Sequence, residues 1–242
     1  MNREFSSDDA PRYLMCETAR VYRLMMIAAG MMGTYTLVLR GGVFCNAQTA
    51  NFALMAVALG SGDWNGAIYY LIPITAYLMG AVLSELLPKK VRSWGLFRWD
   101  TYLVGFEVIT LFVVGFIPLT VTDRLVQIII NFICSMQYNT FRQAEQVPMA
   151  TTFCTNHLRQ TGIHLVKYLK TGDEAMRRRI QSHLTMIACF VAGGVVEVVL
   201  CGYAAERAIW LAMVPLLVAF SILARADVGI EHDFLGRIPA GH

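Results

Sequence analysis

The sequence predicts an all-α, polytopic integral membrane protein, and two observations of composition and one of pattern lead to this class. Of the 242 residues, 56% are hydrophobic and only 15% are charged, whereas a soluble domain carries about 25% charged residues. The mean hydropathy is +0.51. Apolar runs recur along the whole chain, which indicates many membrane segments rather than a soluble domain with a single anchor.

The apolar runs lie between a polar N-terminal segment, residues 1–20, and a polar C-terminal tail, residues 226–242. Each run predicts a helix, because a helix satisfies its backbone hydrogen bonds internally in lipid. The run 66–87 is long enough to span the roughly 30 Å hydrocarbon core. A charged connector is expected at 171–183. The eight runs are 21–39, 41–60, 66–87, 102–120, 125–141, 147–169, 184–203 and 208–223.

The eight runs fall into two similar sets of four, which predicts an internal duplication with repeats at 21–120 and 121–225. The third and seventh runs share a pattern of small residues followed by Glu: AYLMGAVLSE at 76–85 resembles ACFVAGGVVE at 188–197. The second and sixth runs each carry a Phe-Cys pair, then polar residues, then a Gly-Asp turn at 62–63 or 172–173.

Charge distribution favours one of two topologies. If all eight runs span the membrane, about 12 Lys and Arg lie inside and 7 outside. If the second and sixth runs instead enter and leave on one face, the tally is about 16 to 3, which agrees better with the positive-inside tendency. We therefore expect six full spans and two partial or broken helices in inverted repeats. Eight full spans remain the alternative. Both termini are expected on the inner, cytoplasmic side of the membrane.

Two polar stretches, GGVFCNAQTAN at 41–51 and ATTFCTNHLR at 150–159, interrupt otherwise apolar sequence. Buried amides and hydroxyls are costly in lipid unless they are bonded. They therefore predict either broken backbone around a midplane site or hydrogen bonding between packed helices. The residues expected to bind substrate are Asn46, Gln48, Thr49, Asn51, Gln137, Asn139, Thr152, Thr155, Asn156, His157 and Arg159.

Glu107 and Glu197 lie inside the fourth and seventh runs. Carboxylates at membrane depth often relay protons, so both residues are candidates for proton or ion coupling. The alternative is an ion pair between either carboxylate and Arg159.

The stretches RGGVFCNAQTAN at 40–51, LIP at 71–73, SMQYNTFR at 135–142 and ATTFCTNHLRQ at 150–160 resemble the YoaK family over residues 21–225. That resemblance implies a small, multi-pass integral protein of the bacterial cytoplasmic membrane, of unassigned function. The family pattern has Thr-Gly-Asn where this chain has Thr49-Ala50-Asn51 and Thr155-Asn156-His157. It also has an Asp near the position of Gly33.

No phosphate-binding loop, dinucleotide fingerprint, nucleophile elbow or zinc motif is present, so we expect no enzyme activity, cofactor or metal. Nucleic-acid binding is not expected either. The leading hypothesis is a transporter or channel for a small polar solute or ion, embedded in the lipid bilayer and assembled as a homodimer. The alternative is a non-transporting accessory subunit of a larger membrane complex.

Overall fold

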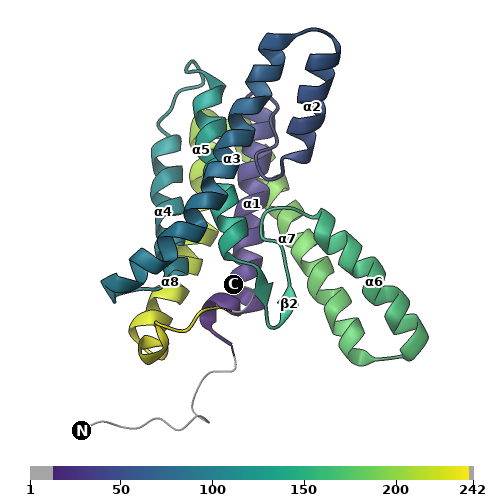
Figure 1. Ribbon diagram of the computed structural model, residues 1–242, viewed down its shortest axis with the longest axis vertical. Helices are drawn as coiled ribbons and strands as arrows, with labels where there is room; N and C mark the ends of the chain where they lie inside the picture. The colour runs from purple at the N-terminus through teal and green to yellow at the C-terminus, as the bar shows by residue number, and fades with distance from the viewer. Residues whose placement is uncertain (1–12, 240–242) are drawn as a thin grey trace.

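The computed structural model describes residues 13–239, so most of the predicted N-terminal segment and the last three residues of the tail lie outside the described residues. The described chain is helical apart from one short β-hairpin (Figure 1), which confirms the all-α prediction. Three helical stretches, Ala19–Leu39, Trp64–Trp94 and Glu174–Val228, are long and apolar enough to cross a membrane. The protein is therefore a helical membrane protein.

Six helices form the body of the molecule, and two further helices extend from it. The six are α1 (Ala19–Leu39), α3 (Trp64–Val91), α4 (Trp99–Val114), α5 (Asp123–Thr140), α7 (Glu174–Ala204) and α8 (Met213–Val228). The two further helices are α2 (Thr49–Gly60) and α6 (Thr155–Thr171). The hairpin pairs β1 (Gln143–Ala144) with β2 (Val147–Pro148), and 3-10 turns lie at η2 (Met15–Glu17), η3 (Arg92–Trp94), η4 (Ala205–Ala212) and η5 (His232–Phe234).

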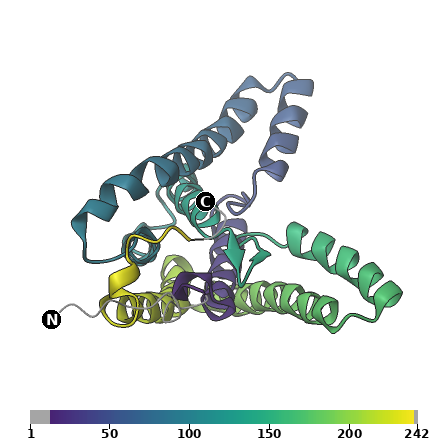
Figure 2. The same cartoon turned by 60° about the horizontal axis from the view of Figure 1, so that its bottom comes forward.

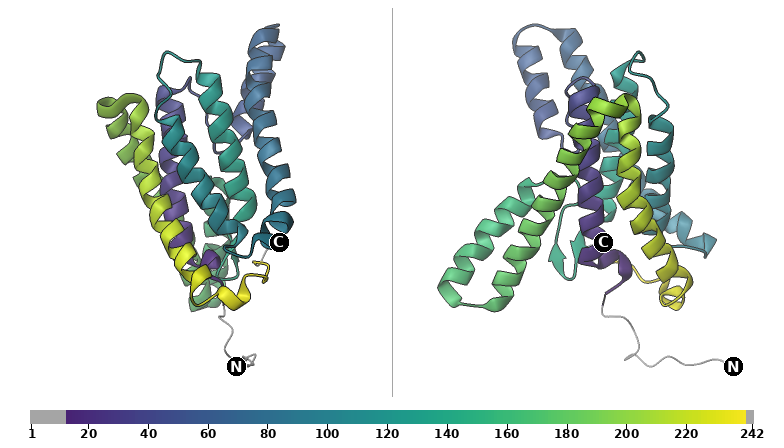
Figure 3. Two further views of the ribbon diagram at one scale, coloured as in Figure 1. Left: turned by 90° about the vertical axis from the view of Figure 1, so that its left-hand side faces the viewer. Right: turned by 180° about the vertical axis from the view of Figure 1, so that it is seen from behind.

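The six helices of the body stand side by side, as Figure 3 shows, with α1 packed against α7 and α8, and α5 packed against α3 and α4. Helix α4 also packs on α8. Helices α2 and α6 each form an antiparallel hairpin with the helix that follows, α3 or α7. These two hairpins extend toward opposite ends of the molecule (Figure 1) and separate from each other as two arms (Figure 2).

Glycines allow the backbones of neighbouring helices to approach closely at two interfaces. A Cβ added to Gly30 on α1 would lie 2.0 Å from the carbonyl oxygen of Phe190 on α7. A Cβ added to Gly193 on α7 would lie 2.2 Å from the carbonyl oxygen of Ile27 on α1. At the other interface, a Cβ on Gly80 of α3 would lie 2.4 Å from the carbonyl oxygen of Phe132 on α5. Small residues at such positions let helices associate by packing alone in lipid.

Two predicted runs become helical only in their second part. The run 41–60 is helical only from Thr49, after an irregular stretch, and the run 147–169 begins in β2 and is helical only from Thr155. The run 102–120 ends its helix at Val114, before Pro118.

The prediction of a charged connector at 171–183 is wrong, because all but its first three residues form the beginning of α7. The Asp173 carboxylate accepts a hydrogen bond from the Ala175 N–H at 2.8 Å and so caps the helix. Glu174 and Arg177 pair at 2.7 Å along the first turn. With 31 residues, α7 is about 46 Å long and exceeds the hydrocarbon core.

The predicted tail is partly folded against the start of α4. The buried Arg98 lies with its Nε 3.4 Å from Asp227 and 3.7 Å from Glu231. Glu231 in turn accepts a hydrogen bond from the Met15 N–H at 2.6 Å, which joins the C-terminal tail to the N-terminal turn η2. Two acidic residues of the predicted tail, Asp227 and Glu231, therefore belong to a buried ionic cluster with Arg98.

Candidate functional site

The first polar stretch is an irregular segment that turns back from the end of α1 before α2 begins. Gly41 and Gly42 adopt left-handed φ values of 74° and 72°, a conformation that side chains disfavour. The Asn46 side chain then donates to the carbonyl of Ala29 at 2.7 Å, well back along α1 from its end at Leu39. The chain therefore re-enters the bundle here before α2 leads it outward again.

Side chains of this first stretch bond to α5. Gln48 donates to Asn131 Oδ1 at 2.6 Å, and Asn131 donates to Cys45 Sγ at 3.1 Å. Asn51 donates to Gln48 Oε1 at 2.9 Å, as expected for two residues three apart on one helix face. Some polar side chains of this stretch therefore form hydrogen bonds between helices, which is one of the two interpretations that the sequence allowed.

The second polar stretch, residues 150–159, bonds to the lower part of α5 and to α7. Gln137 donates to the carbonyl of Thr151 at 3.0 Å. His157 Nε2 lies 2.8 Å from the carbonyl oxygen of Ala150, and His157 Nδ1 lies 3.0 Å from His183 Nδ1 on α7. Helix α5 therefore supplies a bonding partner to each of the two polar stretches.

The hydrogen bonds fix the tautomers of this histidine pair. A carbonyl oxygen can only accept, so His157 Nε2 carries a hydrogen and, in the neutral ring, His157 Nδ1 accepts. His183 must then donate from Nδ1. Its Nε2 is left as a buried acceptor with no hydrogen-bond partner among residues 13–239. The ring of His164 lies 5.7 Å from that of His183.

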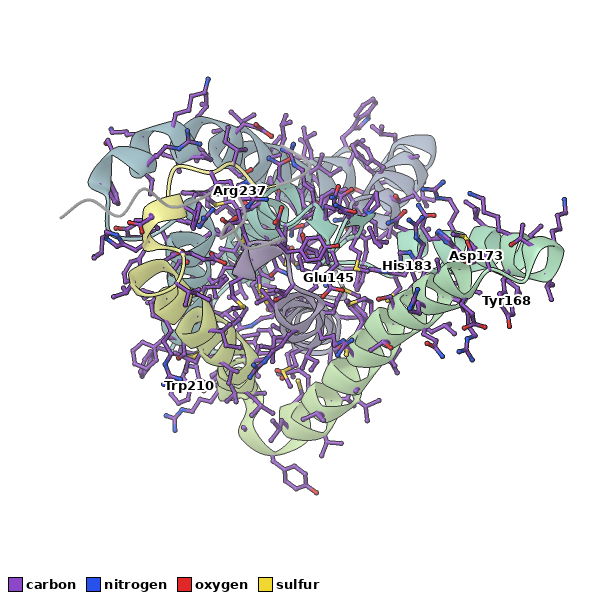
Figure 4. The ribbon with its side chains drawn as sticks, turned by 90° about the horizontal axis from the view of Figure 1, so that it is seen from below. Glu145, Tyr168, Asp173, His183, Trp210 and Arg237 are labelled. Atoms are coloured by element: carbon purple, nitrogen blue, oxygen red, sulfur yellow. The ribbon has the colours of Figure 1, made fainter. Side chains whose placement is uncertain are left out.

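The sequence analysis selected His157 but missed His183, because residues 171–183 were assigned to a connector. The Gly172-Asp173 turn was the available signal. A tight turn between two helices makes them antiparallel neighbours, and this places His183 opposite His157 and His164. Figure 4 shows His183 on α7 in the view from below.

Five buried side-chain oxygens from the two stretches and α5 have no hydrogen-bond partner within the described part of the chain. They belong to Asn46, Asn51, Gln127, Gln137 and Thr152. Buried polar groups are nearly always bonded, so each such group in a native structure needs an explanation. Oxygen atoms of this kind can accept hydrogen bonds from a solute or coordinate a cation.

Other predicted site residues lie apart from these oxygens. Thr49, Thr155 and Arg159 are exposed, and Arg159 donates to Asn156 Oδ1 at 3.2 Å on the surface of α6. Asn139 donates to Ser84 at 2.8 Å, so it lies between α5 and α3. Six of the predicted site residues, Asn46, Gln48, Asn51, Gln137, Thr152 and His157, are therefore buried or partly buried. Asn46, Gln48 and Asn51 bond within the first polar stretch and to α1 and α5, whereas Gln137 and His157 bond at the second stretch, and the remaining five residues lie outside both sets.

The ion pair suggested for the membrane carboxylates does not form. Glu107 on α4 and Glu197 on α7 are both fully buried, and none of their carboxylate oxygens has a hydrogen-bond partner among residues 13–239. Arg159, the suggested partner, is exposed. The physical reason is that α6 extends away from the bundle and directs Arg159 outward. A coupling role for the two carboxylates stays a prediction.

The fold thus defines a helical membrane protein with buried polar groups near the start of α2 and near the start of α6. The chain belongs to the family described as protein of unknown function DUF1275, whose model matches residues 21–222. The resemblance to the YoaK family is consistent with this membership. No curated protein and no solved structure matches the chain. Within residues 13–239, no group of three or more His, Cys, Asp or Glu is placed to hold a metal ion.

Proposed function

We propose that this protein is a transporter or channel for a small polar solute or ion. The binding site in this proposal lies where α2 and α6 begin, against α5. The observation that carries the proposal is the set of buried oxygens without partners, which includes those of Asn46, Asn51, Gln137 and Thr152. A bound solute with hydrogen-bond donors, or a cation, would satisfy these acceptors.

The proposed topology has six full spans and two re-entrant helices in inverted repeats. The packing supports it when α1, α2, α3 and α4 are matched to α5, α6, α7 and α8. Under this match the contact of α1 with α7 corresponds to that of α5 with α3, and the hairpin α2–α3 corresponds to α6–α7. The opposite directions of the two hairpins (Figure 1) are those that inversion requires.

The proposed orientation places both termini and the basic end of the bundle in the bacterial cytoplasm. The start of α1, the end of α3, the start of α7 and the end of α8 lie at one end of the molecule (Figure 3). That end carries Arg20, Lys89, Lys90, Arg178 and Arg225, among other basic residues. The opposite end has Arg40, Arg124 and Arg207. This asymmetry follows the positive-inside tendency.

We also propose that two copies assemble as a homodimer. The exposed apolar side chains of α2, including Phe52 and Val57, offer a surface that a second copy can cover.

The alternative function is a non-transporting accessory subunit of a larger membrane complex. The complete burial of Asn46, Asn51 and Thr152 favours it, since a solute can reach these groups only if the helices separate. In that case the unpartnered oxygens would be satisfied by water trapped during folding.

Reconstitution tests the transport proposal. We expect liposomes containing the full chain to show flux of at least one probe from a panel of urea, glycerol, Na⁺, K⁺ and Cl⁻. Asn51→Leu and Thr152→Val remove acceptor oxygens without adding charge, and we expect either to reduce that flux tenfold or more. Thr110→Val is the matched control, because Thr110 on α4 bonds only to the carbonyl of Phe106 on its own helix.

Two results would overturn transport. One is flux no greater than in empty liposomes for every probe, together with a stoichiometric partner retained in mild detergent; this combination supports the accessory subunit. The other is equal flux in Thr152→Val and Thr110→Val, because the buried hydroxyl would then have no part in the path.

A further inference from the structure

A polar cavity of about 460 Å³ lies between the β-hairpin and the first turns of α7, apart from the buried network described above. Its lining includes Glu145 and Gln146 at the hairpin turn and Arg178, Arg179 and Ser182 on α7. Figure 4 shows the hairpin, marked by Glu145, beside the segment of α7 that holds His183. The volume is in the range of cavities that bind small molecules.

The lining residues of α7 form one face of the helix. Ala175, Arg178, Arg179 and Ser182 follow the spacing i, i+3, i+4, i+7, so these side chains share one side of α7. Arg177, between them in sequence, lies on a different face and pairs with Glu174 at 2.7 Å. In the described part of the chain, neither Arg178 nor Arg179 forms an ion pair.

The opposite wall is a strained turn whose carboxylate is already engaged. Glu145 and Gln146 both have left-handed φ values, 49° and 65°, which side chains other than glycine rarely adopt. Glu145 Oε1 accepts a hydrogen bond from the Ala19 N–H at 3.0 Å, and the Glu145 N–H donates to the carbonyl of Glu17 at 2.9 Å. These contacts hold the turn against the start of α1, and the lining carries two guanidinium groups against one carboxylate, so its charge is net positive.

The cavity lies where α7 passes from polar to apolar sequence. The residues up to His183 are mostly charged or polar, whereas those from Leu184 onward are apolar. Because α7 is about 46 Å long and the hydrocarbon core about 30 Å thick, its first turns project into the head-group region. Basic cavities at this level are suited to phospholipid head groups.

We propose that this cavity binds a phosphate group, with Arg178 and Arg179 as its cationic ligands and Ser182 as a hydroxyl donor. The planar, forked guanidinium matches the geometry of phosphate oxygens, and two adjacent forks can hold one phosphate between them. The phosphate belongs either to the head group of an acidic phospholipid or to a free anion. This site is independent of the proposed transport path.

The test measures binding by native mass spectrometry on the full chain purified in detergent. The probes are phosphatidylglycerol, phosphatidylcholine and inorganic phosphate. The variants Arg178→Gln and Arg179→Gln each remove one cationic ligand. Arg177→Gln is the matched control, since it removes the same charge from the neighbouring position but does not line the cavity.

We expect each of the two cavity variants to weaken binding of the preferred probe about tenfold, the value of one charge-assisted hydrogen bond. Arg177→Gln should stay within twofold of the original chain. Preferential binding of phosphatidylglycerol identifies the head group as the source, and binding of inorganic phosphate alone identifies the free anion. The proposal is overturned if neither phosphatidylglycerol nor inorganic phosphate binds, or if Arg177→Gln weakens binding as much as the two cavity variants do. Thermal melting of each variant establishes that it is folded.

Discussion

The close contact of α1 with α7 gives a prediction whose size follows from the structure. Gly30→Ala would place a Cβ 2.0 Å from the carbonyl oxygen of Phe190, and Gly193→Ala would place one 2.2 Å from that of Ile27. Two non-bonded heavy atoms in ordinary van der Waals contact lie about 3.5 Å apart. Both obstacles are backbone atoms, which cannot rotate away, so either substitution must push the two helices apart by more than about 1 Å.

The expected cost of either substitution is a net loss of about 2 kcal/mol in the free energy of unfolding. Overpacking costs about 1–3 kcal/mol, and the upper part of this range applies because rigid backbone opposes the new methyl group. Alanine is favoured over glycine inside a helix by about 1 kcal/mol, which offsets part of the loss. Reversible unfolding in mixed detergent micelles, followed by tryptophan fluorescence, measures the difference.

Gly202→Ala provides the matched control on the same helix. A Cβ at Gly202 on α7 would meet no atom within 4 Å, so the helix-propensity gain should appear alone and leave the protein equally or slightly more stable. If Gly30→Ala and Gly193→Ala unfold no more easily than Gly202→Ala, the α1–α7 interface is not limited by backbone contact and the reasoning fails.

Two further predictions concern buried polar groups. Asn131→Leu removes the hydrogen-bond acceptor of Gln48 and the donor to Cys45. We expect the free energy of unfolding in the same assay to fall by about 1–3 kcal/mol. An unchanged value would show that these two hydrogen bonds contribute little to stability. Burial raises the pKa of Glu231 above its ordinary 4.5, so the docked tail favours the protonated acid and loses stability as pH rises through that raised pKa. Glu231→Gln should therefore flatten the fall in Tm between pH 4 and pH 8, whereas parallel Tm profiles would contradict the assignment.

The sequence predicted the class of fold well because apolar runs report directly on helices in lipid. It was less successful where polar composition and helical structure coincide. Residues 174–183 are charged, yet they continue α7 without a break, because a helix that extends beyond the membrane needs no apolar side chains. The break before α2 was foreseen from Asn46, Gln48 and Asn51, whose density an ordinary spanning helix could not satisfy.

The partners of the polar residues could not be predicted, because they come from distant parts of the chain. Gln48 and Asn131 are 83 positions apart in sequence, and His157 and His183 are 26 apart. Gln137 and Asn139 illustrate the same limit over a short distance. They were grouped as lining one path, but residues two apart on a helix point in nearly opposite directions. Gln137 therefore meets Thr151, whereas Asn139 meets Ser84.

The paired imidazoles of His157 and His183, at the start of α6, can take up one additional proton and keep the hydrogen bond between them. A proton added to His183 Nε2 leaves the Nδ1-to-Nδ1 bond intact, and transfer along that bond moves the charge onto His157. A second proton would set two N–H groups against each other at 3.0 Å, which only separation of the rings could relieve. Double protonation would therefore break this contact between α6 and α7.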